Sequence, residues 1–306
     1  MIEASPELRK TQAQLLCNTT DLTSLPDGGF RATSKYSDIP ITWYDSLTSV
    51  PKAPTSAPFV LAHEFFDALP IHAFESTKSG WRELMVAHNP PGSKIAAQTT
   101  HVIGAPTPEF SLAKAITPTG HSMLLPELSE RYKKLKNHVG SMIEISPDSM
   151  TIVEDMAKRI GTSKAGAALI FDYGPLDTIP VNSLRGIRNH RMVSPFSNPG
   201  ETDISADVDF FALAERALVA HEDVEVHGPV EQGHFLLSMG MQERLKQVLK
   251  ELEGKPEETK QLVVSGFERL TERHGGAMGK VYKAMAIVPE RGGKRPVGFG
   301  GQSVEQ

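Results

Sequence analysis

Three clusters of polar residues in this sequence have the side-chain types needed to bind a charged ligand or to move a proton. They are Glu3 with Ser5, His63 with Glu64 and Asp67, and Asp172 with Tyr173. Carboxylates accept hydrogen bonds from sugar hydroxyls and bind the planar guanidinium group through two parallel hydrogen bonds. His, Asp and Glu are also common proton-transfer groups in enzymes. The clusters therefore predict a single site if the fold brings them together.

Each cluster also has a purely structural interpretation. Glu3 can be a solvated residue near a chain end. His63 and Glu64 can form a hydrogen-bonded pair that closes a strand, while Asp67 holds the turn that follows. The segment 172–174 has the composition of a strand-to-loop transition, in which the final glycine supplies a positive φ. The residue types alone leave both interpretations open.

Two apolar runs predict the strands that would position the second and third clusters. Residues 59–62 are too few to distinguish a strand from a helix by periodicity, but the prolines before them and the turn-like residues 67–70 favour a buried strand. Residues 166–174 have no polar face, which is typical of a parallel strand covered on both sides. Ligands bind beyond the carboxyl ends of the strands in open α/β sheets, so the clusters have a common place to meet.

A helix directly before the second of these strands indicates the fold class. Ser146 is a suitable N-cap, Pro147 suits the first helical position, and Gly161 is a suitable end. The apolar face between them consists of Met150, Val153, Met156, Ala157 and Ile160. A helix that leads into an apolar strand is half of a doubly wound α/β unit, so we predict an α/β fold.

Further segments predict the remaining elements. The first helix starts at Ser5 and Pro6 and ends near residues 17–18. Its predicted inner face consists of Leu8, Gln12, Leu15 and Leu16. We also expect strands at 39–44 and 281–288, a hairpin of 71–75 with 81–88, and helices near 210–218, 241–252 and 257–273.

Two stretches lack such periodicity. Residues 89–130 are rich in proline and predict a long loop, either a substrate-facing lid or an ornament. Residues 291–306 are rich in glycine and scattered charge, and predict a disordered tail. The expected organisation is one domain over residues 1–290, with an insertion at about 71–145 and the tail at 291–306.

Composition excludes several classes of protein. Hydrophobic residues make up 39% of the 306 residues, as in an ordinary globular protein. The 32 Lys and Arg residues nearly balance the 37 Asp and Glu residues, so no overall field attracts nucleic acid or anionic lipid.

Cys17 is the single cysteine, which excludes an intramolecular disulfide and any multi-cysteine metal site. No apolar run approaches the roughly 20 residues of a membrane span, and no targeting segment is visible. Oligomeric state is not readable from these features.

Three alternative chemistries have weak support. The segment 63–67 imitates the His-Glu-x-x-His zinc motif, but its last position is Asp67 and Pro70 curtails any helix, so we expect no metal there. The other histidines are scattered singly. No G-x-S-x-G elbow supports a serine hydrolase, and neither a P-loop nor a G-x-G-x-x-G loop is present.

Several of these motifs, in order along the chain, resemble the MidA-like S-adenosylmethionine-dependent methyltransferases. The matching segments are Glu-Ala-Ser-Pro at 3–6 with Arg9 and Gln12, Trp43, 64–70, 81–83, 172–174, Leu184-Arg185 with His190, Asp203, 208–210, 228–229, 232–233 with 235–236, and 278–279. Two positions depart from the family pattern, since this chain has His63 in place of Asn and Ser183 in place of Thr. The resemblance extends over nearly the whole chain.

The resemblance implies a doubly wound, Rossmann-like methyltransferase sheet with S-adenosylmethionine as cofactor. Mitochondrial members of the family are protein arginine methyltransferases of complex I assembly, which implies a complex I subunit as partner and a location in the mitochondrial matrix. On this basis Glu3, Ser5 and His63 are expected at the cofactor. Glu64 and Asp67 are the expected catalytic residues.

The family resemblance also implies that Asp172 and Tyr173 line the substrate pocket.

The family pattern also places a glycine-rich loop just before the Glu-x-Ser-Pro segment, and this sequence starts after it. The sheet is therefore expected to be N-terminally incomplete, with an exposed edge at the strand before Glu64. Two explanations stay open: the sequence is an incomplete version of a longer enzyme, or it is a short form without catalysis. In the second case the chain would act as an assembly scaffold that binds the same partner.

Overall fold

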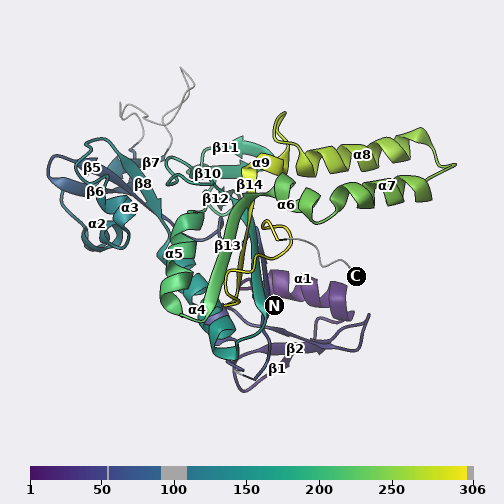
Figure 1. Cartoon of the computed structure of the whole chain (residues 1–306). Helices are drawn as coiled ribbons and strands as arrows, with labels where there is room; N and C mark the ends of the chain where they lie inside the picture. Colours follow the sequence, from purple (N-terminus) through teal and green to yellow (C-terminus); the bar gives the residue numbers. More distant parts are fainter. Residues whose placement is uncertain (54, 91–108, 302–306) are drawn as a thin grey trace.

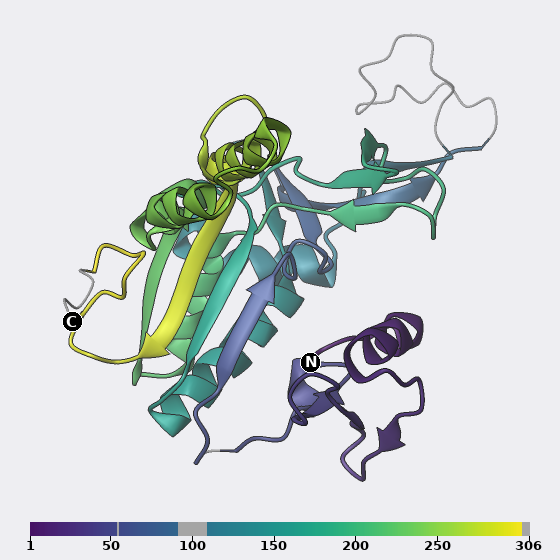
Figure 2. The ribbon, with the colours of Figure 1, turned by 90° about the vertical axis from the view of Figure 1, so that its right-hand side faces the viewer.

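The computed structural model describes residues 1–53, 55–90 and 109–301. Its central element is a four-stranded sheet in the order β13-β14-β9-β4. These strands are β4 (Phe59–His63), β9 (Ala167–Tyr173), β13 (Val224–Glu231) and β14 (Tyr282–Pro289). β4 runs parallel to β9, whereas β14 is antiparallel to both β9 and β13. Figure 2 shows the four strands side by side.

Helices cover one face of this sheet. They are α4 (Pro147–Ser163) and α5 (Phe210–Ala220), and both lie behind the strands in Figure 2. The predicted apolar side of α4 is confirmed, since Val153, Ala157 and Ile160 are fully buried in the main core. Ser146 caps the helix as predicted, but the helix runs past Gly161 and ends at Ser163, where Lys164 adopts a left-handed conformation. The α/β prediction is therefore confirmed.

The opposite face of the sheet is covered in part, over β14 and β9, by a short helix and the C-terminal segment. α6 (Gln232–Ser238) contributes Phe235, which packs with Phe299 against Ala284 and Ala286 of β14. We expected residues 291–306 to be disordered. This is wrong for residues 291–301, because the buried Phe299 anchors them, and residues 302–306 lie outside the described residues.

β4 lies at one edge of the described sheet. Phe59 and Leu61 are 81% and 70% exposed, and only Ala62 of the strand is buried. The prediction of a strand at 59–62 is confirmed, and so is its exposed edge. The prediction that the strand is buried is correct for one face only: Val60 and Ala62 pack against the main core, whereas Phe59 and Leu61 lie on the other face and are exposed.

The N-terminal segment lies on the β4 side of the main sheet (Figure 2), and its Leu47 is buried in the main core. It contains α1 (Pro6–Cys17), β1 (Thr23–Ser24), β2 (Phe30–Thr33), β3 (Pro40–Trp43) and the short helix η1 (Leu47–Ser49). The extent of α1 is as predicted, with Ser5 as N-cap. Its predicted inner face is wrong: Leu8 and Leu15 are exposed, while Arg9 and Ala13 are buried.

Arg9 is buried because its charge and its planar group both find partners. Its guanidinium forms an ion pair with Asp45 and lies 4.3 Å from the centre of the Phe30 ring. A paired, stacked arginine can occupy a position that an apolar pattern would give to leucine.

Residues 71–90 and 109–145 form a lobe, here called the inserted lobe, which projects at the left of Figure 1. Its sheet has the order β7-β6-β5-β8. The elements are β5 (His72–Thr77), β6 (Gly80–His88), β7 (Phe110–Lys114), α2 (Gly120–Leu124), η2 (Leu125–Glu127), α3 (Glu130–Lys133) and β8 (Met142–Ile145). The hairpin is as predicted. The loop predicted at 89–130 is wrong where β7 and α2 occur, and residues 91–108 lie outside the described residues.

Two smaller parts complete the described chain. A sheet in the order β11-β10-β12 consists of β10 (Arg185–Arg188), β11 (Arg191–Val193) and β12 (Asp203–Ser205). The helices α7 (Met241–Glu251), α8 (Glu257–Thr271) and α9 (Met278–Val281) precede β14, and α7 and α8 project as a pair in Figure 1. Across the described ranges, no helix has the length and apolar character that a membrane span requires.

Candidate active site

Glu64 directly follows the carboxyl end of β4 in a strained backbone conformation. Its φ is +47°, a left-handed value that is rare for residues other than glycine. The strand ladder holds it there, because its N–H donates to the carbonyl oxygen of Phe171 over 3.0 Å. Such conformations cluster at functional sites, where surrounding contacts maintain them. The strain therefore agrees with a functional role for Glu64.

Two tyrosines hold the Glu64 carboxylate. The Tyr282 hydroxyl donates to Glu64 Oε1 over 2.6 Å, and it also contacts the Tyr173 hydroxyl. Burial raises the pKa of both phenols, and the hydrogen bond to Glu64 raises the pKa of Tyr282 further. Both hydroxyls are therefore protonated at neutral pH, and the Tyr282 hydroxyl donates a hydrogen bond to the Glu64 carboxylate. Tyr282 was missed from the sequence, where it was only part of a closing strand.

Asp172 is fully buried, and its carboxylate fixes the loop that follows β4. Oδ2 accepts hydrogen bonds from the backbone N–H groups of Phe65 (3.1 Å), Phe66 (2.9 Å) and Asp67 (3.4 Å). Oδ1 accepts from the N–H of Tyr173 over 2.9 Å. Burial, with a further contribution from Asp67, raises the pKa of Asp172 to about 7. These contacts favour a positioning role over the predicted direct contact with substrate.

Asp67 lies at the end of that loop and is almost completely buried. The Ser205 hydroxyl donates to its Oδ2 over 2.9 Å, and its carbonyl oxygen accepts from the N–H of Ala206 over 2.9 Å. Burial raises the pKa of the Asp67 carboxyl, and the negative charge of Glu64 acts in the same direction. A positive group entering here would offset both effects.

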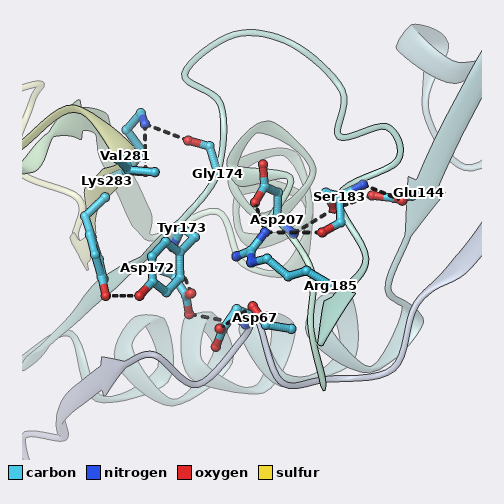
Figure 3. Close-up of polar contacts among 12 residues, drawn as sticks. Asp67, Glu144, Asp172, Tyr173, Gly174, Ser183, Arg185, Asp207, Val281 and Lys283 are labelled. Atoms are coloured by element: carbon cyan, nitrogen blue, oxygen red, sulfur yellow. Dashed lines mark hydrogen bonds and ion pairs between the residues drawn. The ribbon is translucent and has the colours of Figure 1, made fainter. Parts of the chain in front are cut away.

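A polar network beside this loop joins Ser183, Arg185 and Asp207 to Glu144 of the inserted lobe (Figure 3). Glu144 of β8 is buried and accepts hydrogen bonds from the Ser183 N–H over 3.0 Å and from the Ser183 hydroxyl. The same hydroxyl accepts from the N–H of Asp207 over 2.8 Å, and Asp207 pairs with Arg185 at 2.5 Å. The Arg185 guanidinium lies 5.0 Å from the centre of the Tyr173 ring. Burial raises the pKa of Glu144.

Glu3 is held at the start of the chain by its local contacts. Its carboxylate accepts from the Ser5 N–H over 3.0 Å and from Gln12 Nε2 over 2.9 Å. Gln12 is itself oriented by the Trp43 indole N–H, which donates to its Oε1 over 2.9 Å. The Ser5 side chain accepts from the N–H of Leu8 and caps α1, so it contacts the helix end. His63 is exposed, with its Nδ1 3.9 Å from Glu64 Oε1.

Two adjoining pockets are lined by the predicted residues Glu3, Glu64 and Asp67, whereas the predicted cofactor residues Ser5 and His63 line neither pocket. We call the first the Glu3–Glu64 pocket. It has a volume of about 460 Å³ and is lined by both of these carboxylates, by Asp45 and Asp148, and by the apolar Phe65 and Leu69. The second is the Asp67–Glu144 pocket, of about 350 Å³. Ala68 and Leu69 line both pockets, so the loop after β4 forms the wall between them.

The structure thus brings Glu3 and Glu64 to one pocket and places Asp67 in the next. Tyr173 contacts Tyr282, which contacts Glu64, whereas Asp172 holds the loop after β4 through its backbone N–H groups. Glu144, Ser205 and Arg185 were not predicted as site residues. Arg185 lies in a segment that carried the family resemblance, but the residues themselves gave no signal for Glu144 or Ser205.

Comparison with known proteins identifies the family. The family model described as "Putative S-adenosyl-L-methionine-dependent methyltransferase" matches residues 1–230. The chain belongs to this family.

Two curated relatives illustrate the similarity. "Protein arginine methyltransferase NDUFAF7, mitochondrial" of Rattus norvegicus is 34% identical over 296 residues, which are 95% of this chain and 59% of the relative. The Homo sapiens protein of the same name is 34% identical over 255 residues, 83% of this chain and 50% of the relative. The chain therefore spans between about half and three-fifths of the length of these family members.

Solved structures of the family's fold come from Burkholderia thailandensis. One, bound to S-adenosyl-homocysteine, has a TM-score of 0.60 and 21% identity, and covers 84% of this chain and 58% of that chain. Another, a native structure from the same superfamily and organism, has a TM-score of 0.58 and 21% identity, with coverages of 84% and 60%. This confirms the predicted methyltransferase fold.

Proposed function

We propose that this chain is an S-adenosylmethionine-dependent protein arginine methyltransferase. The observation that carries the proposal is the strained Glu64, held by Tyr282 at the end of β4 in the same pocket as Glu3. Asp67, three residues further along, opens the adjoining pocket. An acidic cofactor pocket beside an acidic substrate pocket suits the transfer of a methyl group to a cationic acceptor.

The residues of the Glu3–Glu64 pocket fit this cofactor. Its volume of about 460 Å³ lies in the range of roughly 300–1,000 Å³ that is usual for ligand sites. Each oxygen of Glu3 accepts one hydrogen bond from Ser5 or Gln12. A carboxylate has about four acceptor positions, so Glu3 can also accept from both hydroxyls of a ribose. We assign Glu3 to the ribose, with Ser5 fixing its orientation and His63 at the outer side.

The Asp67–Glu144 pocket suits an arginine side chain. Its walls are apolar, formed by Leu84, Val86 and Leu112 of the inserted lobe, and its buried acidic groups are Asp67 and Glu144. An arginine has an aliphatic stem that packs on apolar walls and a planar charged head that pairs with carboxylates. Because burial raises the pKa of both carboxyls, a guanidinium would find acceptors that gain from its charge.

The proposed chemistry assigns positioning and proton transfer to this chain's residues. Bound S-adenosylmethionine would supply an electrophilic methyl group and, with its S–CH3 bond broken, would leave as S-adenosylhomocysteine. Asp67 orients the guanidinium, and Glu64 accepts the proton that its attacking nitrogen loses as the new N–C bond forms. Tyr282 keeps the Glu64 carboxylate aimed at this point. Tyr173 supports Tyr282, and Asp172 holds the loop that carries Asp67.

We extend the proposal to a substrate and a compartment. The curated relatives are named as mitochondrial protein arginine methyltransferases. We therefore propose an arginine of a protein as the acceptor, in the mitochondrial matrix. The family resemblance supports a complex I subunit as that protein, methylated during complex I assembly.

The experiment that tests the proposal combines binding and turnover in Glu64→Gln. We expect the wild-type chain to bind S-adenosylmethionine by calorimetry and to label an arginine-containing protein substrate, detected by mass spectrometry. The variant should lose methyl transfer while it retains cofactor binding, because the amide keeps the side-chain shape but cannot take the proton.

Glu130→Gln, a change of an exposed carboxylate in the inserted lobe, is the matched control and should leave turnover intact. Unchanged turnover in Glu64→Gln would contradict the assigned role. Binding of the protein partner without binding of the cofactor would instead support the scaffold interpretation.

A further inference from the structure

Two histidines and a buried glutamate meet in the inserted lobe, outside both pockets. His72 lies on β5, Glu83 on the adjacent strand β6, and His121 on α2. Ala73 pairs with Leu84 in the hairpin, so His72 and Glu83 are diagonal neighbours on one face. Leu84 and Val86 point to the other face and line the Asp67–Glu144 pocket.

The three side chains converge on one point. His72 Nδ1 lies 2.7 Å from Glu83 Oε1, and His121 Nδ1 lies 3.5 Å from the same oxygen. The two imidazole rings are 4.1 Å apart, measured between their centres. One potential ligand atom from each residue lies within 4.8 Å of the other two. A single carboxylate oxygen thus faces two ring nitrogens.

Glu83 is held in this orientation from its other side. The Thr119 hydroxyl donates to Glu83 Oε2, and Glu83 is almost completely buried. Thr119 also caps α2, since its side chain accepts from the Ser122 N–H over 3.0 Å, so the same residue places His121 and orients Glu83. A carboxylate oriented through its second oxygen is the usual arrangement around metal ligands.

We propose that His72, Glu83 and His121 bind a zinc ion. Two imidazoles and one carboxylate are a typical ligand set for zinc, with a fourth position open to water. Zinc–ligand bonds of roughly 2.0–2.2 Å place tetrahedral ligands about 3.3–3.5 Å apart. The 3.5 Å between His121 Nδ1 and Glu83 Oε1 already fits, and the His72 contact must widen by about 0.6 Å.

The ion would fasten α2 to the β5–β6 hairpin. His121 is 58% exposed on its side chain, so solvent can deliver the ion without unfolding the lobe. Binding requires neutral imidazoles, so zinc uptake should weaken in more acidic solution. The site adds a bound ion with one open coordination position to the inserted lobe and is independent of the proposed methyl transfer.

The test is zinc titration of the metal-free 306-residue chain by competition with a chromophoric chelator. We expect one equivalent to bind tightly, and Co²⁺ to give the visible absorption bands of a four-coordinate ion. His121→Ala removes a ligand with an exposed side chain, so the fold should survive. The zinc affinity of His121→Ala should fall by more than the roughly 10–100-fold that loss of a residue supporting a ligand costs. The zinc affinity of Thr119→Val should fall within that range.

His88→Ala is the matched control. His88 lies on β6, as Glu83 does, and its Nε2 is 3.8 Å from Glu109 Oε1. Both side chains of this pair are exposed. We expect no change in zinc affinity in this variant. Three results would each overturn the proposal. The wild-type chain could fail to bind one equivalent of zinc, His121→Ala could bind zinc as tightly as the wild type, or Cys17→Ser could lose zinc binding while His121→Ala keeps it.

Discussion

At the scale of single residues, the site depends on side chains that hold one another. Glu64 is exposed directly after β4, and its proposed role as proton acceptor depends on a fixed side-chain direction. Tyr282 supplies that direction through a 2.6 Å hydrogen bond, and Tyr282 itself touches Tyr173. Tyr173 ends β9, Tyr282 begins β14 and Glu64 directly follows β4, so three neighbouring strands of the main sheet position these residues.

Tyr282→Phe should therefore separate the positioning of Glu64 from cofactor binding. Hydrogen bonds to charged groups contribute about 1.5–3 kcal/mol, so we expect kcat to fall by roughly 10–100-fold. The Kd for S-adenosylmethionine should change little, because Tyr282 does not line the Glu3–Glu64 pocket. Steady-state kinetics and calorimetry measure the two quantities. Tyr36→Phe, at an exposed tyrosine, is the control, and an unchanged kcat in Tyr282→Phe would contradict the positioning role.

Asp172 gives a prediction about stability and pH. Its pKa is raised by burial to about 7, against about 3.9 for an ordinary aspartate. Between these values the folded state binds more protons than the unfolded state, so the free energy of unfolding should decrease as the pH rises from about 4 to about 7. Above that window the contribution should be constant. Asp172→Asn has no such proton and should lose this part of the slope.

Urea unfolding at several pH values between 4.5 and 7.5 measures this slope. Asp21→Asn, at an exposed aspartate, should keep the wild-type profile. A wild-type profile that rises with pH in this window, or a slope that is unaltered in Asp172→Asn, would show that the four backbone N–H donors outweigh burial.

The residue types predicted part of the site. Glu64 and Asp67 were predicted because they follow an apolar run, and strand ends meet at one edge of a sheet. The role of Glu3 came from the family resemblance. Tyr282 and Glu144 could not be found this way, since a tyrosine or glutamate inside a strand looks like any other alternating residue. His72 and His121 are 49 positions apart, so their meeting depends on how α2 packs on β6.

At the scale of elements, the junction between β4 and β9 shows how the chain aligns the strand ends. The carbonyl oxygen of Pro58 accepts from the N–H of Ala167 over 2.9 Å, and the two strands then pair in parallel from Phe59 with Ala167 onward. Gly166 permits this approach. Its φ is +86°, and a Cβ at that position would lie 2.0 Å from the Pro58 oxygen.

Gly166→Ala should therefore destabilise the whole sheet. A positive φ and a backbone clash act together, and strained sites of this kind cost about 1–3 kcal/mol each, so we expect a loss of at least about 2 kcal/mol in the free energy of unfolding. Gly266→Ala is the control, because nothing lies within 4 Å of its added Cβ inside α8. Replacing a helical glycine in open space should stabilise by about 0.5–1 kcal/mol. Equal effects in both variants, measured by urea unfolding, would contradict this account.

Periodicity predicted the amphipathic helices well and the irregular parts poorly. α4, α5 and α7 each show an apolar stripe, and their positions are close to those predicted. In α1 the apolar pattern indicated the wrong face, because buried Arg9 is satisfied by Asp45 and Phe30. β7 and α2 were missed because each is only five residues long and prolines surround them.

At the scale of the whole molecule, the Asp67–Glu144 pocket lies where three parts of the chain meet. The loop after β4 supplies Asp67, the inserted lobe supplies Leu84, Val86 and Glu144, and the strand β12 region supplies Ile204 and Ser205. Pockets often form at such junctions, because each part contributes one wall. The sequence predicted the hairpin and the loop separately. It could not show that they face each other, since no local pattern encodes contacts between distant segments.

A wall of the pocket can be tested without disturbing the fold. Val86 and Met85 are neighbours on β6, both are exposed, and their side chains point to opposite faces of the strand. Val86 lines the Asp67–Glu144 pocket, whereas Met85 does not. Val86→Trp should obstruct the arginine and raise its KM by roughly tenfold or more, because the substrate loses binding in both ground and transition states. Met85→Trp adds the same bulk on the other face and should leave KM unchanged.

Calorimetry should give the same Kd for S-adenosylmethionine in Val86→Trp and Met85→Trp, since neither residue lines the Glu3–Glu64 pocket. Equal KM values for Val86→Trp and Met85→Trp would place the acceptor arginine elsewhere on the molecule.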